Sequence, residues 1–505
     1  MPIHREEFLY VPHVDHQSAL IAWGAFYLDR KKPKDEDPSG SFRFELLDDE
    51  DLKKPGKLPE GPRTRGSVGR NTEPFGPARV TVETATGQLV HDALVEDRPF
   101  LRVEGLQPNT RYRYRVQVAG APWAAATFDI RLKDENDGLA VPDATARVHE
   151  FTTFRAPTEP SGAFTFAVIG DPGTGEAEQL GVGRALAGLI DSEGIRFVLT
   201  MGDNIYMKPR HSGLLGTIEK GFRTITGRMR MTGDEDDDWF SSYFVPYRDV
   251  ISRVPVFPCL GNHDSENTEE DDDLAQLVDN LFLEERFPDQ INEWLLGDEL
   301  LDTMFYRFRF GRDAEFVAID TSFTDRQDGG EVVFELIRGK RQPPLASPQH
   351  RAFLNAILSE PAPRWRIPFG HHPPFSLGPA HGDNPMVRNL AKQFATAAPG
   401  ASVWLSGHEH NFQHHREGRL HYLLSGAAGK CNEIRKVKGS PAHACCHNSV
   451  CHFLLIKVTD QALTVRLVDG AGRTAALTSR AVFPRHEGEE IVIGRDPDGR
   501  VADQD

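Results

Sequence analysis

The N-terminal part of the chain shows a regular alternation of apolar and polar positions. Between residues 111 and 118, Tyr and Val alternate with Arg and Gln, which is the period-two pattern of a half-buried β-strand. A turn at Thr86-Gly87 between two short apolar runs predicts a hairpin. The other predicted strands are residues 18–23, 42–47, 80–83, 88–90 and 151–154. We therefore expect an all-β sandwich domain over residues 1–157, with a long loop insertion in the polar stretch 30–77.

After a Pro-containing linker at residues 156–162, the pattern changes to continuous apolar runs that end in polar residues. Such runs are typical of buried parallel strands. They end, in chain order, at Asp171, Asp203, Asn262, His371 and His408. Apolar residues at helical spacing between the first two runs, and again after Ser347-Pro348, predict connecting helices. This alternation predicts an α/β domain over residues 162–480, followed by a polar C-terminal tail over residues 481–505.

The polar residues at these strand ends are candidates for one shared site, because open α/β sheets bind ligands beyond the carboxyl ends of their strands. Asp203 can bridge two metal ions with its two carboxylate oxygens. His408 and His410 are two residues apart, so both imidazoles point to the same side of an extended or turn segment. Two cations about 3.5–4 Å apart lower the pKa of bound water and hold the oxygens of the group that the water attacks.

Five sequence blocks carry a resemblance to a known family. They are Gly170-Asp171-Pro172-Gly173, Gly202-Asp203-Asn204-Ile205-Tyr206, Gly261-Asn262-His263-Asp264, Gly370-His371-His372-Pro373 and Gly407-His408-Glu409-His410. In this order they resemble the signature of the calcineurin-like metallophosphoesterases. Gly173 stands where the wider superfamily has a metal-binding histidine, and Tyr206 offers a phenolate instead, which makes the chain similar to the purple acid phosphatases. The resemblance implies a four-layer α/β/β/α domain preceded by a fibronectin-III-like β-sandwich.

The resemblance also implies two metal ions. One is expected at Asp171, Asp203, Tyr206 and His410, and the other at Asp203, Asn262, His371 and His408. The first ion is expected to be Fe(III), since a phenolate is a hard, anionic ligand, and the second to be Zn, Mn or Fe(II). The other interpretation of Tyr206 is that it packs beneath two divalent ions. His263 and His381 are assigned to transition-state stabilisation and leaving-group protonation, and Asp264 to the orientation of His263.

The expected function is hydrolysis of phosphate monoesters through a metal-bound hydroxide, with a small phosphate ester as substrate. The alternative is a phosphodiesterase, or a dedicated nucleotide, phytate or phospholipid phosphohydrolase, of the same fold. The pocket loops at residues 207–239 and 265–299 decide between these functions. A binding protein with an inactive phosphatase domain would lack at least one ligand, and none is missing. The histidines interpreted as packed or surface residues are His350, His372, His414 and His415.

The net charge, the apolar runs and the first residues indicate which partners and which compartment to expect. The net charge of −17 disfavours nucleic acid, because phosphate polymers would be repelled. No apolar run approaches the roughly 18 residues of a membrane span. The first residues have no signal-peptide core, which predicts a cytoplasmic protein; the alternative is a secreted or periplasmic protein whose leader is missing from this chain. The oligomeric state stays open.

Five cysteines in 505 residues are too few for a disulfide scaffold. The cysteines that cluster in the sequence, close to three histidines, are Cys431, Cys445, Cys446 and Cys451. Their spacing matches no zinc motif that we can name, and we interpret them as thiols rather than as a structural metal site.

Overall fold

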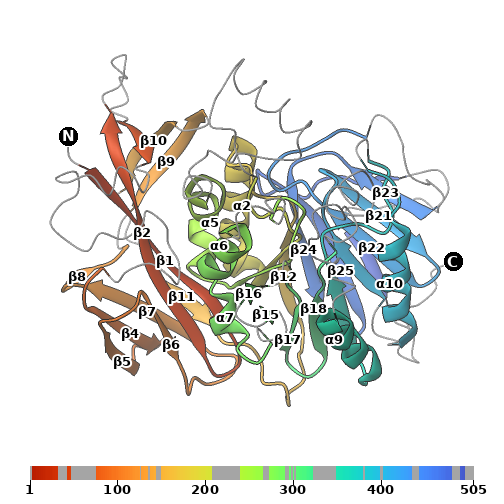
Figure 1. Ribbon diagram of the computed structural model, residues 1–505, viewed down its shortest axis with the longest axis horizontal. Helices are drawn as coiled ribbons and strands as arrows, with labels where there is room; N and C mark the ends of the chain where they lie inside the picture. Colours follow the sequence, from red (N-terminus) through yellow and green to blue (C-terminus); the bar gives the residue numbers. More distant parts are fainter. Residues whose placement is uncertain are drawn as a thin grey trace.

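The computed structural model describes residues 3–31, 42–46, 75–124, 127–134, 137–143, 149–206, 239–264, 272–290, 295–296, 299–300, 303–321, 348–378, 381–397, 402–434, 443–479 and 490–494. An N-terminal all-β region lies beside a larger region of sheets and helices (Figure 1). No helix in the described part of the chain is long and apolar enough to cross a membrane.

The N-terminal region consists of two antiparallel sheets. The first contains β1 (Ile3–Val14), β2 (Ala19–Lys31), β3 (Phe42–Leu46), β10 (Asp137–Asp143) and β9 (Thr127–Asp134), with β6 (Phe100–Val103) also paired to β2. The second contains β11 (Glu150–Thr152), β7 (Arg111–Val118), β4 (Ala78–Thr84) and β5 (Leu89–Val95), with β8 (Ala121–Pro122) paired to β7. The all-β prediction is therefore confirmed, whereas the finer fibronectin-III-like assignment stays a prediction.

Local sequence explains two of these strands directly. In β7 the Tyr and Val side chains are buried and the Arg and Gln side chains are exposed, as the period-two pattern requires. The predicted hairpin is β4–β5, and its turn places Gly87 at φ 86°, a left-handed conformation that glycine adopts without strain. Strand β1 was not predicted, because its first half is charged and its second half is buried at every position.

The larger region contains two stacked sheets. One has the order β14 (Val256–Pro258), β13 (Ile195–Thr200), β12 (Phe164–Ile169), β24 (His452–Val458), β25 (Ala462–Asp469) and β27 (Glu490–Gly494). The other has the order β17 (Tyr306–Phe310), β18 (Ala314–Ala318), β19 (Trp365–Phe369), β20 (Val403–Ser406), β22 (Leu420–Ser425), β21 (Phe412–Glu417), β23 (Ala444–Asn448) and β26 (Thr478–Ser479). Aromatic rings join them: Phe166 of β12 meets Phe316 of β18 with centroids 5.1 Å apart.

Helices cover the two outer faces. Helices α2 (Ala177–Glu193) and α5 (Val245–Ile251) lie beside the β12 sheet, and α9 (Pro348–Ser359) and α10 (Pro385–Ala397) lie beside the other sheet (Figure 1). Val182, Leu186 and Ile190 of α2 are buried, as their spacing predicted. The four-layer α/β/β/α fold class is confirmed.

Parallel pairing of the strands places the five sequence blocks at the carboxyl-terminal edges of the two sheets. Strands β12, β13 and β14 are mutually parallel, and so are β18, β19 and β20. Asp171, Asp203 and Asn262 follow the first three strands, while His371 and His408 follow β19 and β20. The carboxyl ends of both sheets therefore supply the candidate residues.

The predicted C-terminal tail and the two predicted pocket loops can be compared with the described residues. Residues 490–494, which fall in the predicted polar tail, form β27 and pair with β25, so part of that segment belongs to the sheet. Of the two predicted pocket loops, residues 207–238 lie outside the described residues. The second loop contains α6 (Asp272–Asn280), the short α7 (Leu283–Arg286), and the two-residue strands β15 (Leu295–Leu296) and β16 (Glu299–Leu300).

Candidate metal centre

The turns that carry the site residues hold an uncommon backbone conformation. Asp171, Asp203 and His408 have φ values of 52°, 49° and 74°. Left-handed backbone is unfavourable for residues with a Cβ, and it persists where the surrounding structure enforces it, often at functional sites. The enforcing contacts include a hydrogen bond of 2.8 Å from the backbone N–H of His408 to Oδ2 of Asp171.

Close backbone packing explains the glycine at position 173. A Cβ at Gly173 would lie 2.3 Å from the carbonyl oxygen of Asn204 and 2.4 Å from Cα of Ile205, so no side chain fits there. The backbone N–H of Tyr206 donates a hydrogen bond of 2.8 Å to the carbonyl oxygen of Gly173. The space where the wider superfamily has a histidine is thus filled by the segment that delivers Tyr206.

The first group of donor atoms surrounds the phenol oxygen of Tyr206. This oxygen lies 2.9 Å from Oδ2 of Asp203, 3.2 Å from Oδ1 of Asp171 and 2.9 Å from Nε2 of His410. Asp171 and Asp203 are almost completely buried, and Tyr206 is 9% exposed. We call these four residues the tyrosine set.

The second group surrounds Nε2 of His371. This nitrogen lies 2.9 Å from Oδ1 of Asn262, 2.9 Å from Nδ1 of His408 and 3.4 Å from Oδ1 of Asp203. Nδ1 of His371 lies 2.7 Å from the carbonyl oxygen of Met201. A carbonyl can only accept, so Nδ1 carries the proton and the lone pair of Nε2 faces the other donors. We call these four residues the histidine set.

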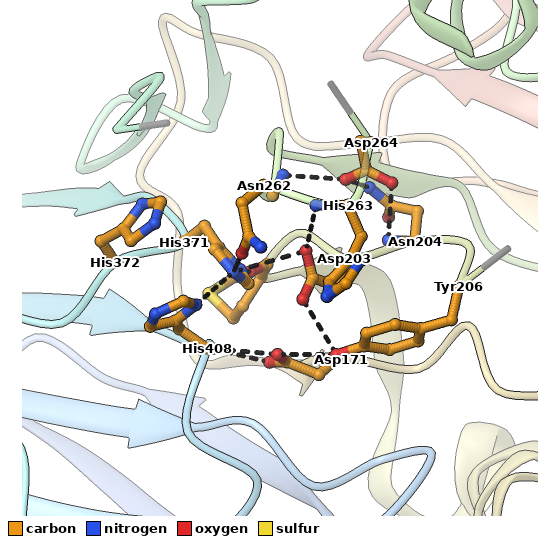
Figure 2. Close-up of polar contacts among 12 residues, drawn as sticks. Asp171, Asp203, Asn204, Tyr206, Asn262, His263, Asp264, His371, His372 and His408 are labelled. Atoms are coloured by element: carbon orange, nitrogen blue, oxygen red, sulfur yellow. Dashed lines mark hydrogen bonds and ion pairs between the residues drawn. The ribbon is translucent and has the colours of Figure 1, made fainter. Parts of the chain in front are cut away.

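The two sets meet at Asp203, which directs Oδ2 toward Tyr206 and Oδ1 toward His371 (Figure 2). All the ligands predicted from the sequence are brought together in this way. Their atoms are oxygen and nitrogen donors of the kinds that bind Zn, Fe and Mn. Neighbouring donor atoms lie about 3 Å from one another on both sides of the shared carboxylate. This spacing fits a pair of metal ions held by these residues.

The electrostatics of the tyrosine set also favour a cation. Burial, and then the charge of Asp203, raise the pKa of Asp171 well above its usual value. Burial, and then the charges of Asp203 and Asp171, raise the pKa of Tyr206. Burial and then Lys430 lower the pKa of His410 to about 3. A cation among these groups would counter the raised pKa values of Asp171 and Tyr206, because it stabilises carboxylate and phenolate, and the lowered pKa of His410 keeps that imidazole neutral and able to bind the cation.

Asp264 joins the two central loops. Its Oδ1 accepts the backbone N–H of Asn204 at 2.9 Å, and its Oδ2 accepts the backbone N–H of Gly261 at 2.8 Å and the side-chain amide of Asn204 at 2.9 Å. These contacts are drawn in Figure 2. The sequence also predicted that Asp264 orients His263, and that role stays a prediction. The contacts above make Asp264 a positioning residue for the loops that carry Asp203 and Asn262.

The two histidines predicted to act on substrate both lie beside the donor sets. The ring of His263 is 4.6 Å from the ring of Tyr206, and its backbone N–H donates to Oδ1 of Asp203 at 3.0 Å. The ring of His381 is 3.9 Å from that of His408, and its backbone N–H donates to the carboxylate of Glu409. His263 is half-buried and His381 is exposed, as residues that meet a substrate would be. Their chemical roles stay predictions.

Sequence reasoning missed several neighbours of the site. His372, interpreted as a packing residue, is buried, and its ring centroid is 4.5 Å from that of His408. Nζ of Lys430 lies 3.9 Å from the centre of the Tyr206 ring, and the Asn432 amide is 3.1 Å from Nδ1 of His410. One usable signal for His372 was present in the sequence, which is its position next to the predicted ligand His371. Lys430 and Asn432 belong to a loop without a motif.

Where the structure describes them, the histidines interpreted as packed or surface residues and the clustered cysteines lie outside the groups able to hold a metal, with the exception of His372. Among the described residues, the groups able to hold a metal are His371, His372 and His408, and Asp171, Asp203 and His410. In that part of the chain, no group of three ligands includes Cys431, Cys445, Cys446 or Cys451. His350, His414 and His415 are buried outside both groups.

Comparisons with known proteins agree with this geometry. Residues 164–412 match the family model described as calcineurin-like phosphoesterase. The chain is 22% identical over 344 residues to tartrate-resistant acid phosphatase type 5 of Mus musculus, covering 65% of this chain and 93% of the relative. It is 22% identical over 312 residues to the same protein of Oryctolagus cuniculus, covering 59% of this chain and 83% of the relative.

One solved structure resembles nearly the whole chain. The structure of PhoD has a TM-score of 0.56 and 14% sequence identity, and the match covers 97% of this chain and 90% of PhoD. At this identity the likeness concerns the fold. It extends across the N-terminal β region as well as the α/β region.

Proposed function

We propose that this chain, whose residues 164–412 match the calcineurin-like phosphoesterase family model, is a metal-dependent phosphoesterase that hydrolyses phosphate monoesters at a dinuclear metal centre. The observation that carries the proposal is the meeting of the tyrosine and histidine sets at Asp203, whose two oxygens face opposite sets. One shared carboxylate between two groups of donors is the arrangement that a two-metal hydrolytic site needs. The acid phosphatase relatives support the monoester preference.

Two ions bound by these sets would lower the pKa of an attacking water and withdraw charge from the phosphoryl group. The residues of the chain fix where this happens. Met201 holds the tautomer of His371, and Asp264 fixes the backbone turns on either side of Asp203. His263 and His381, at the accessible side of the donor sets, would hold protons at the phosphoryl and leaving-group oxygens.

We assign Fe(III) to the tyrosine set and Zn, Mn or Fe(II) to the histidine set. The tyrosine set holds two carboxylates and a phenol, all buried, whereas the histidine set adds only a neutral amide and two imidazoles to the shared carboxylate. A larger number of anionic oxygen ligands favours the more highly charged, harder ion. The resemblance to purple acid phosphatases supports the same assignment.

Steady-state rates on p-nitrophenyl phosphate and bis-p-nitrophenyl phosphate test the proposed substrate class. At equal metal content, kcat/KM for the monoester should equal or exceed that for the diester. A clear excess for the diester would make the chain a phosphodiesterase. Activity on neither ester in a protein that holds both ions would point to a dedicated substrate selected by the loops at residues 207–239 and 265–299.

A further inference from the structure

Two of the cysteines form a pair beside the metal centre. Cys431 and Cys451 are both half-buried and are not joined, and their side chains share a hydrogen bond. Cys431 follows Lys430 in the loop after β22, and Cys451 immediately precedes β24. A backbone hydrogen bond of 2.9 Å from His452 to the carbonyl oxygen of Ala427 holds the two segments side by side. The sulfur contact is thus built by the strand framework.

The loop that carries Cys431 is attached to the donor sets on both sides of the cysteine. Before it, the backbone N–H of Gly429 donates to the carbonyl oxygen of Asp171 at 3.2 Å, and Lys430 covers the Tyr206 ring. After it, the backbone N–H of Asn432 donates to the carbonyl oxygen of His410 at 2.6 Å. A change at Cys431 therefore reaches residues that contact three members of the tyrosine set, which are Asp171, Tyr206 and His410.

We propose that Cys431 and Cys451 are a modification site that low-molecular-weight disulfides, such as glutathione disulfide, convert to an intramolecular disulfide. The bond would tie the Lys430–Asn432 loop to the start of β24. It would thereby shift the contacts of Lys430 with Tyr206 and of Asn432 with His410. This effect on catalysis rests on the proposed function, whereas the thiol chemistry does not.

The reaction balances with one equivalent of disulfide. The Cys431 thiolate attacks one sulfur of glutathione disulfide, the S–S bond breaks, and one glutathione thiolate leaves. The Cys451 thiolate then attacks Cys431 in the mixed disulfide and releases the second glutathione. Two protein thiols are oxidised, the reagent is reduced to two thiols, and the two protons from the cysteines end on the glutathiones.

The surroundings of the pair assign the order of attack. The hydrogen bond from Cys451 lowers the pKa of Cys431, while burial and then the charge of Glu433 oppose this effect more weakly. The same hydrogen bond, together with burial and the carboxylates of Glu176 and Glu178, raises the pKa of Cys451. Cys431 is therefore the attacking thiol and Cys451 the resolving one. Cys445 and Cys446 lie buried in β23, and burial raises the pKa of both thiols.

The test uses the reduced, full-length, metal-loaded protein treated with glutathione disulfide and analysed by intact mass and peptide mapping without reductant. The wild type should lose about 2 Da and yield one bridged peptide that contains Cys431 and Cys451. Cys451→Ser should instead keep a glutathione on Cys431, and Cys431→Ser should form no bridge. The matched control Cys445→Ser should react like the wild type.

Several results would overturn the proposal. These are five free thiols after treatment, a stable glutathione adduct on Cys431 in the wild type, or a bridge to another cysteine. The catalytic consequence has its own measurement: kcat/KM for p-nitrophenyl phosphate should change at least about twofold on oxidation, recover with dithiothreitol, and stay constant in Cys451→Ser. An unchanged kcat/KM in the bridged wild type would refute the link to the metal centre. The mass measurement detects the state of the thiols even in a protein without phosphatase activity. A failure of the disulfide proposal can therefore be distinguished from a failure of the proposed function.

Discussion

The tyrosine set and the histidine set share Asp203 but differ in charge and in how they are held. The tyrosine set contains two buried carboxylates and a phenol, with pKa values that burial and mutual repulsion raise for Asp171 and Tyr206. In the histidine set, burial and neighbouring imidazoles lower the pKa of His408, so this set is built from neutral donors around one carboxylate. The difference agrees with the proposal that one carboxylate serves two ions of unequal charge, because its two oxygens face unlike neighbours.

The charge of Asp203 itself reflects this position between the sets. Burial opposes its ionisation, but positive charge on His371 and His263, together with hydrogen bonds from the His263 backbone and Tyr206, outweighs burial and lowers the pKa of Asp203 to about 2. Its partner carboxyl, Asp171, gains most from a cation, because its pKa is shifted in the opposite direction.

Removing the shared residue should have the largest effect. Asp203→Ala deletes a ligand from both sets, so we expect loss of both ions and a fall in kcat of at least about 10⁴-fold. Metal analysis and phosphatase rates on the same preparation check this. Asp92→Ala, which removes an exposed carboxylate in β5 far along the chain from the site, is the control and should keep both properties. An Asp203→Ala enzyme with two ions and near-normal rates would end the bridging assignment.

A ligand that belongs to one set should separate the two ions. His371→Ala removes the centre of the histidine set and leaves the tyrosine set intact. We therefore expect about one ion per chain and a fall in kcat of roughly 10³-fold, because a bound ion contributes several kcal/mol to transition-state stabilisation. The ion that remains should be iron. Loss of both ions, or of iron alone, would show that the two sets are not separable as described.

The substrate-side histidines should affect rate but not metal. His263→Ala and His381→Ala should each lower kcat by about 10²-fold or more, because general acid and base groups typically contribute 10²–10⁴-fold, while metal content stays unchanged. His414→Ala serves as the control, since His414 is buried in β21 against His421 and belongs to neither group that could hold a metal. A change below about twofold in either substrate-side variant would remove that residue from the catalytic assignment.

The smallest effect on rate, and the sharpest on spectrum, is expected from Tyr206→Phe. Tyrosinate bound to Fe(III) absorbs visible light by charge transfer, so the oxidised, iron-loaded wild type should be coloured and the variant colourless. Phe keeps the ring beneath Lys430 and beside His263, so the fold of the site should persist. A band that survives in the variant would assign the iron to other ligands. A colourless wild type with iron bound would favour two divalent ions above a packing tyrosine.

Particular residues show what the sequence could and could not predict. Strand β7 and the ligand blocks were predictable, because period-two alternation and apolar runs ending in ligand residues are local signals. Strand β1 was not, because it pairs with β2 and packs Phe8 against Phe244 of the α/β region, where tertiary contacts decide burial. Strand β27 likewise depends on the edge offered by β25.

The candidate site shows the same contrast between local sequence signals and contacts that form only in the folded chain. The ligands occur in fixed blocks, whereas the link from Asp264 to Asn204 and the position of Lys430 over Tyr206 join loops far apart in the chain. No pattern within one segment encodes such contacts. The close approach of Gly173 to Asn204 and Ile205 gives the physical reason for a glycine that the sequence could only identify by resemblance.

The central claim is that one chain holds two different ions through Asp203, and metal content per chain tests it most directly. Elemental analysis of purified, active wild-type protein should find about one iron and about one further ion, Zn, Mn or a second iron, per chain. The ratio should stay fixed across gel-filtration fractions that carry the phosphatase activity. Full activity in fractions with one ion per chain or none would contradict the account.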